Sequence, residues 1–150
     1  MRKILLTFFI GILYLNKVSA QKYTATYIKD ANKAAIEWWT QVNAGKYEQS
    51  YSKLSDVLKN RATSKEWVAQ MSLLMNEFGN IENRTVTNTY FKSNLDGFED
   101  GFYVIIEYDV KYSKTSKHSE NIVLKQSDKF EWLIFDFNYT FQHLETTEEL

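Results

Sequence analysis

Cysteine and proline are both absent from the 150 residues of this chain. Without cysteine, the protein can form no disulfide, use no thiolate as a nucleophile and bind no metal through sulfur. The lipid-modified N-terminus of a bacterial lipoprotein is excluded for the same reason. Because exported domains of higher cells are often stapled by disulfides, an exported chain without cysteine is more typical of a bacterial periplasmic or secreted protein.

Histidine is scarce, and the spacing of the two histidines predicts no metal site. His118 and His143 are far apart and form no His-x-x-x-His pattern, so we expect both at the surface. The acidic stretch 94–101, NLDGFEDG, reads as a turn-rich loop, because Phe98 stands where a calcium loop needs an oxygen ligand. The chain also has no nucleophile elbow and no phosphate-binding loop. We therefore expect no cofactor.

The first twenty residues have the layout of a secretory signal peptide. A basic start at Arg2 and Lys3 precedes the apolar run 4–15, and Val18-Ser19-Ala20 supplies small residues. Cleavage is expected after Ala20. Twelve apolar residues are too few for a bilayer span, which needs about 20, so no stable membrane span is expected once the signal is removed.

The predicted mature chain, 21–150, is a single mildly acidic domain. It keeps all 19 acidic residues but only 15 of the 18 basic ones, because Arg2, Lys3 and Lys17 are lost. An acidic balance argues against binding to nucleic acid, whose affinity depends on neutralising phosphates. No repeat, low-complexity tract or linker divides the chain, and its length suits one core.

Three helices are expected in the first half of this domain. Apolar residues recur at helical spacing over 24–43, from Tyr27 to Val42, and Gly45 can provide a left-handed stop. The same spacing predicts a second helix over 46–59. A third begins after a capping box, in which Thr63 and Glu66 satisfy each other's amides, and it ends at Gly79.

From Ile81 the apolar period changes to two, which predicts four strands. Their expected bounds are 81–91, 102–112, 118–126 and 130–141. The even-numbered face of 102–112 is apolar throughout, whereas the odd-numbered face is apolar at Tyr103 and Ile105 and then charged. We therefore expect an α+β fold, with three N-terminal helices packed on the concave face of a curved four-stranded antiparallel sheet.

The last predicted strand carries rings on both parities. Phe130 and Trp132 share one phase, whereas Phe135, Phe137, Tyr139 and Phe141 hold the other. Strand side chains alternate strictly between faces. Either a bulge near Leu133–Phe135 shifts the phase, or the strand stays regular and buries both faces in turn.

Several short stretches together resemble a known family. They are Ser64-Lys65-Glu66-Trp67, Gly79, Arg84, Ala34-Ala35, Trp38-Trp39, Gly45-Lys46-Tyr47, Ser50-Tyr51, 100–105, Glu120 and Trp132. In order and spacing they resemble the family called domain of unknown function 4019, over roughly 31–138. The resemblance implies an exported bacterial protein with a cone-like fold similar to nuclear transport factor two and the cystatins. It supplies no catalytic residues.

The candidate site residues are carboxylates and rings. Glu107, Asp109 or Asp136 could act as a general base if a ring-lined cavity raised its pKa, with Tyr103 donating to an oxyanion. Strand alternation instead favours placing these carboxylates toward solvent. The candidates for ligand contacts are Trp67, Arg84, Tyr103 and Trp132. For Arg84, an ion pair with an acidic residue such as Glu120 is the default interpretation.

Three functions remain open at this point. The favoured one is a non-catalytic exported domain that binds a small ligand or a protein. The second is an enzyme of the cone-fold type, an isomerase or hydrolase, that uses a buried carboxylate and a tyrosine. The third is an envelope-associated protein that oligomerises, for example as a homodimer, through the free face of its sheet. Aromatic residues serve cores and interfaces alike, so the sequence does not separate the first and third.

Overall fold

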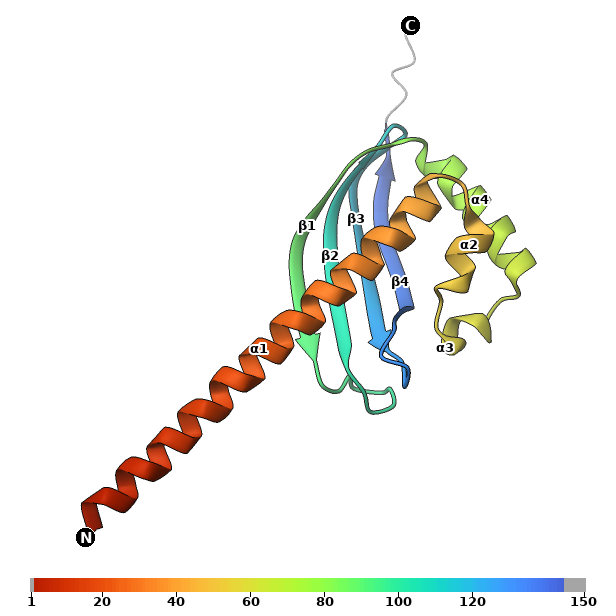
Figure 1. Cartoon of the computed structure of the whole chain (residues 1–150). Helices are drawn as coiled ribbons and strands as arrows, with labels where there is room; N and C mark the ends of the chain where they lie inside the picture. Colours follow the sequence, from red (N-terminus) through yellow and green to blue (C-terminus); the bar gives the residue numbers. More distant parts are fainter. Residues whose placement is uncertain (1, 145–150) are drawn as a thin grey trace, which may run out of the picture.

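The computed structural model describes residues 2–144, with side chains from Tyr23 onward, and within that range helices precede a four-stranded antiparallel sheet (Figure 1). The helices are α1 (Arg2–Asn43), α2 (Tyr47–Ser52), α3 (Asp56–Lys59) and α4 (Ser64–Phe78). The strands are β1 (Ile81–Lys92), β2 (Tyr103–Tyr112), β3 (Thr115–Gln126) and β4 (Trp132–His143), in the spatial order β1-β2-β3-β4. The predicted α+β fold is confirmed.

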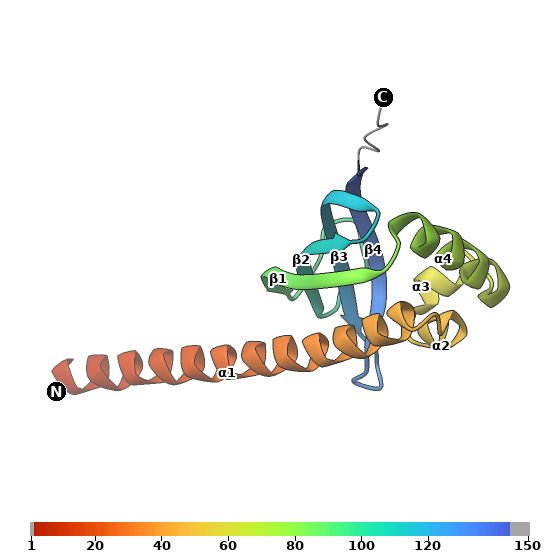
Figure 2. The same cartoon turned by 90° about the horizontal axis from the view of Figure 1, so that it is seen from above.

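Helix α1 crosses the sheet and then projects well beyond it toward the N-terminus (Figures 1 and 2). It is one helix through the expected signal segment and the predicted helix 24–43, so it begins much earlier than periodicity indicated. Ala31, Ala35, Trp38 and Val42 form its buried stripe at helical spacing. Gly45 adopts the predicted left-handed conformation, with φ 72°. Among the described helices, none combines the length and hydropathy that crossing a bilayer requires.

The predicted second helix over 46–59 is wrong, because the chain is interrupted between α2 and α3. Residues 53–55 run alongside β4, where the Ile134 amide donates to the Lys53 carbonyl (3.0 Å) and the Ser55 amide donates to the Ile134 carbonyl (2.8 Å). Backbone groups cannot satisfy a strand and a helix at once. The Ser55 side chain then caps α3. The described chain therefore has four helices where the sequence predicted three.

Helix α4 begins and ends as predicted. The Thr63 hydroxyl accepts from the Glu66 amide (3.3 Å), and the Glu66 carboxylate accepts from the Thr63 amide (2.8 Å), which completes the capping box. Gly79 follows the helix with φ 83°, a value that favours glycine. Met71 and Phe78 are its buried residues.

The sheet has an inner face toward the helices and an outer face away from them. Strand β2 alternates as expected: Val104, Ile106, Tyr108, Val110 and Tyr112 are buried on the inner face. On the outer face, Tyr103 and Val123 form a second small core with Phe135. The third strand begins at Thr115, earlier than predicted, because only two residues separate it from β2.

A bulge in β4 explains the two phases of its rings. Ile134 pairs with Leu124, and Asp136 pairs with the preceding residue Val123, so Phe135 is the extra residue. Before the bulge, Trp132 packs on the inner face, and after it Phe137 packs there against Trp38. Of the two alternatives that the sequence left open, the structure shows the bulge. Phe130, in contrast, precedes β4 and is exposed, so its predicted place in the strand is wrong.

The space between the helices and the sheet is filled by the chain's own rings. Trp38 is fully buried. Its ring centroid lies 4.6 Å from that of Trp39, 5.7 Å from Phe137 and 6.4 Å from Trp67. Close packing of this kind leaves a hydrophobic core rather than an internal binding cavity.

Candidate functional site

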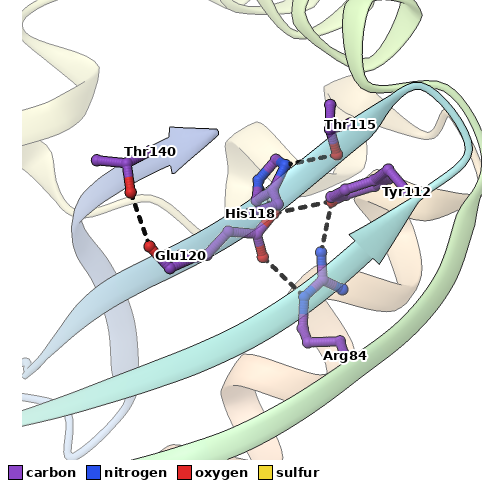
Figure 3. A network of polar contacts seen from close by, with 7 residues as sticks. Arg84, Tyr112, Thr115, His118, Glu120 and Thr140 are labelled. Carbon is purple, nitrogen blue, oxygen red and sulfur yellow. Dashed lines mark hydrogen bonds and ion pairs between the residues drawn. The ribbon is translucent and has the colours of Figure 1, made fainter. Parts of the chain in front are cut away.

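A buried polar cluster joins three strands on the inner face (Figure 3). Arg84 in β1 donates from Nε to Glu120 Oε2 in β3 at 2.8 Å, and from Nη2 to the Tyr112 hydroxyl in β2 at 2.7 Å. The Tyr112 hydroxyl donates to Glu120 Oε1 at 2.9 Å. Each carboxylate oxygen therefore has a donor, and the predicted Arg84–Glu120 ion pair is confirmed.

Hydrogen bonds and the charge of Arg84 keep Glu120 ionised at neutral pH. Its side chain is fully buried, and burial alone would raise its pKa. The hydrogen bonds and charge from His118, Arg84 and Tyr112 outweigh burial and hold the pKa of Glu120 below its usual value. Trp39 covers the guanidinium of Arg84, which lies 3.5 Å from the indole centroid.

His118 lies inside this cluster, so its predicted surface position is wrong. Its Nδ1 is 3.1 Å from the Thr115 hydroxyl, and its Nε2 is 3.4 Å from Glu120 Oε1. Its ring contacts those of Phe78, Tyr112 and Phe141. Strand register explains the burial: His118 pairs with Val110, another inner-face residue.

The cluster is a structural element rather than an open site. Its members come from β1, β2 and β3. Arg84, Tyr112 and Glu120 already satisfy one another, and aromatic rings close the cluster on the helix side. Burial raises the pKa of Tyr112 far above its usual value, so its hydroxyl remains a donor at neutral pH. Arg84, a candidate for ligand contact, is committed to Glu120.

The candidate carboxylates all lie away from the helix-facing core. Glu107 is half-buried and accepts from the Tyr90 hydroxyl at 3.1 Å, and Asp109 is exposed. Asp136 is half-buried and accepts from the Asn138 amide at 2.9 Å, with Arg61 at 3.8 Å. They are spread over an outer face whose middle is polar.

The candidate tyrosine does not join these carboxylates. The Tyr103 side chain is buried in the small outer core, and its hydroxyl donates to the Glu99 carbonyl at 2.7 Å. Tyr103 and Glu107 are four residues apart on one face, or about 13 Å at the usual rise of a strand. The Tyr103 hydroxyl is therefore committed to a backbone carbonyl, and the tyrosine that meets a candidate carboxylate is Tyr90, against Glu107.

The two candidate tryptophans serve packing. The Trp67 indole donates to the Ser50 hydroxyl at 3.0 Å and links α4 to α2. Trp132 is buried against Tyr27 of α1, with ring centroids 6.0 Å apart. Across the described side chains, no group of three or more His, Asp or Glu residues could hold a metal ion.

A surface groove of about 340 Å³ crosses the middle of the outer face. Its lining includes several hydroxyl and amide side chains, and the Ser119 and Thr140 hydroxyls bond to each other there at 2.8 Å. Its lining side chains include Thr87, Glu107, Asp109, Ser119, Asn121, Asn138 and Thr140. Tyr108 and Tyr139 also line it, and their rings pack against Trp39 and Phe78.

A larger cavity, here called the end cavity, opens where the β1–β2 loop, the β3–β4 turn and α3 meet. Its volume is about 550 Å³. Val57, Leu133 and Phe135 supply apolar surface, and Phe102 and Phe130 are exposed rings in its wall. The sequence analysis missed this cavity, because its walls come from segments that are far apart in the chain.

Phe130 is the most exposed large apolar residue in the described chain, at 80%. A tight turn holds it in place: the Phe130 amide donates to the Ser127 carbonyl (2.9 Å), and the Ser127 amide donates to the Glu131 carbonyl (2.8 Å). The Ser127 hydroxyl also accepts from the Lys129 and Glu131 amides. Phe130 has φ 62°, a conformation that is strained for a bulky residue.

The rim of the end cavity is acidic. Asp56, Asp100 and Asp128 line it as exposed carboxylates. Lys125 is the one basic residue in the lining, and it pairs with Glu99. The rim therefore keeps a net negative charge beside an apolar floor.

The comparison with known families covers most of this fold. The profile of a family described as "Protein of unknown function (DUF4019)" matches residues 34–148. The chain belongs to this family. The match to the DUF4019 family begins within α1 and includes the end cavity and the buried cluster. Among curated proteins, no sequence matches the chain significantly.

Proposed function

We propose that this member of the DUF4019 family is an exported, non-catalytic module that binds a segment of another protein at the end cavity. The observation that carries the proposal is Phe130, which is 80% exposed and fixed by a hydrogen-bonded turn. An exposed aromatic ring beside an apolar cavity is a frequent anchor of protein interfaces.

The turn makes Phe130 suitable for binding at low entropic cost. Interfaces lose affinity when they must order mobile segments, so a turn whose backbone is already fixed by hydrogen bonds keeps more of the contact energy of its side chain. A non-glycine residue in the left-handed region also costs about 1–3 kcal/mol. Nothing in the core requires that cost, because the Phe130 ring faces solvent.

A protein segment suits the end cavity better than a small molecule. Small-molecule sites usually enclose most of the ligand surface, whereas the Phe130 ring stands mostly outside the fold. The inner face is already packed by Trp38 and its neighbours, and the two tyrosines at the outer-face groove, Tyr108 and Tyr139, pack their rings against Trp39 and Phe78. The catalytic alternative lacks a carboxylate close to Tyr103.

Export is part of the proposal, and its support is the signal-peptide pattern of residues 1–20. A periplasmic or secreted location would place the end cavity where it meets other exported or envelope proteins. The absence of cysteine agrees with a bacterial source.

The test is selection from a random peptide library with the purified protein as bait. Peptides enriched on the wild type are then measured against Phe130→Asn and against Leu73→Ala. Asparagine tolerates the left-handed conformation better than phenylalanine does, so Phe130→Asn should keep or raise stability while it removes the ring. Leu73 is 72% exposed on α4 and serves as the matched control.

We expect the enriched peptides to bind Phe130→Asn at least about tenfold more weakly, a loss of about 1.4 kcal/mol. Their affinity for Leu73→Ala should stay within about twofold of the wild type. The proposal fails if no peptide is enriched, or if the enriched peptides bind Phe130→Asn as tightly as they bind the wild type.

A further inference from the structure

We infer that the segment bound at the end cavity is basic, with arginine or lysine side chains interspersed with apolar ones. This inference rests on the proposed function and names the partner chemistry of the same site. It follows from the charges around the cavity and from the exposed face of Phe130.

The rim has three carboxylates without a fixed counter-charge. In the part of the chain whose side chains are described, Asp56, Asp100 and Asp128 have no ion-pair partner. Lys125 is already held by Glu99 and lies over the Tyr103 ring, with Nζ 5.6 Å from its centroid. An acidic ligand would meet net repulsion here, whereas a basic ligand would supply the missing charge.

The apolar surface of the cavity can pack against the aliphatic stems of basic side chains and against apolar residues next to them. Arginine and lysine bury their aliphatic stems against apolar surface while the charged group stays near water. Leu133 and Phe135 offer that surface between the carboxylates. The Phe130 ring can receive a cation over its face, and such contacts contribute about 0.5–1 kcal/mol at exposed sites.

A second copy of this chain is the main competing occupant. The β2–β3 hairpin, at the opposite end of the sheet from the end cavity (Figure 1), contains Lys114 and Lys117. Lys114 is engaged, because its Nζ donates to the Asn76 carbonyl at 2.7 Å. That hydrogen bond holds the Lys114 ammonium group against α4, so Lys114 would have to leave Asn76 to reach a second copy, which favours a different partner.

The experiment uses two synthetic ten-residue peptides: one alternates arginine with leucine, and the other alternates glutamate with leucine. Binding to the full chain is measured by fluorescence anisotropy at 50 and 300 mM salt. The variants are Asp100→Asn/Asp128→Asn and, as the charge-matched control, Glu37→Gln/Glu48→Gln on α1 and α2, where both glutamates are exposed.

We expect the arginine peptide to bind and the glutamate peptide not to bind. The aspartate variant should bind the arginine peptide about fivefold or more weakly at low salt. Raising the salt should lower the affinity of the wild type for this peptide, because screening reduces exposed charge contacts. The control variant should change the affinity less than twofold.

Four results would overturn the inference. One is equal binding of the two peptides, and another is equal weakening by the control variant. The third is concentration-dependent self-association in light scattering that disappears in Asp100→Asn/Asp128→Asn, which would assign the cavity to a second copy. Neutral or acidic library peptides that still depend on Phe130 would refute the basic partner but leave the proposed function intact.

Discussion

Glu120 is a single buried carboxylate on which the stability of this fold depends. Its two oxygens accept from Arg84 on β1 and Tyr112 on β2, and its ionised form is the one that the cluster stabilises. Removing one partner of a buried pair leaves the other charge uncompensated, which usually costs more than the pair itself contributes.

Glu120→Gln should therefore lower the free energy of unfolding at pH 7 by about 3–5 kcal/mol. Urea denaturation measures this, and Asp109→Asn, a change of the same sign at an exposed position on β2, is the control. A decrease in the free energy of unfolding below about 0.5 kcal/mol would show that the cluster does not stabilise the fold as its geometry indicates.

The same residue predicts a pH dependence in the acid range. The pKa of Glu120 is lower in the folded protein than in the unfolded chain. Its contribution to the free energy of unfolding is therefore complete above the ordinary glutamate pKa, and it is lost as the pH falls through the pKa of the folded state. The gap in unfolding free energy between wild type and Glu120→Gln should narrow as the pH falls below about 4.3. A gap that stays constant from pH 7 to pH 3 would contradict this.

At the scale of elements, two local irregularities tie the helices to the sheet. The bulge at Phe135 turns β4 so that its rings serve both faces, and residues 53–55 bond to Ile134, directly before the bulge. The helical layer is thus joined to the sheet by backbone hydrogen bonds as well as by side chains. The exit from α4 at Gly79 is a third such joint, because it lies against the β2–β3 hairpin.

Gly79→Ala and Gly97→Ala can be compared because both glycines have φ 83°, and Gly79 also has ψ −156°, a combination that almost only glycine adopts. At Gly97 a Cβ would meet open space, so the cost should be the conformational one of about 1–2 kcal/mol. At Gly79 the Cβ would lie 2.3 Å from Ser113 Oγ, which accepts from the Asn80 amide at 2.9 Å. At Gly79, overpacking should add about 1–3 kcal/mol to the loss of unfolding free energy that the conformational cost causes. Equal losses in thermal or urea unfolding would be evidence against the clash.

At the scale of the whole molecule, α1 has two parts with different surroundings. Its C-terminal part lies on the sheet and supplies Trp38 and Trp39 to the core, whereas its N-terminal part projects away from the domain (Figure 2). Removal of residues 1–20 would leave the buried stripe from Ala31 to Val42 intact. The proposed signal cleavage is thus compatible with the packing.

Expression of the full chain in an exporting bacterial host should yield a mature protein that begins at Gln21. Intact-mass measurement and N-terminal sequencing of the exported fraction would test this, and Ala20→Arg should block processing because cleavage needs small residues at the site. Recovery of the exported protein with Met1 still present would refute the predicted cleavage.

The sequence alone determined the elements whose signals are local. The stripe of α1, the capping box of α4 and the alternation of β2 depend on neighbours a few residues apart, and the reversed parity of rings in 130–141 required a bulge or a two-sided strand. The Arg84–Glu120 pair was predicted as the default ion pair of an arginine that begins a strand just after the glycine that ends a helix.

Features that depend on contacts between distant segments were decided only by the tertiary structure. Lys53 and Ser55 leave the helical conformation because Ile134, about eighty residues later, offers hydrogen bonds. His118 is buried because its strand register places it opposite Val110. The end cavity exists only where 55–57, 99–102 and 125–135 meet. Local periodicity records which face of an element is apolar, but it contains no information about which remote backbone or charge that element will meet.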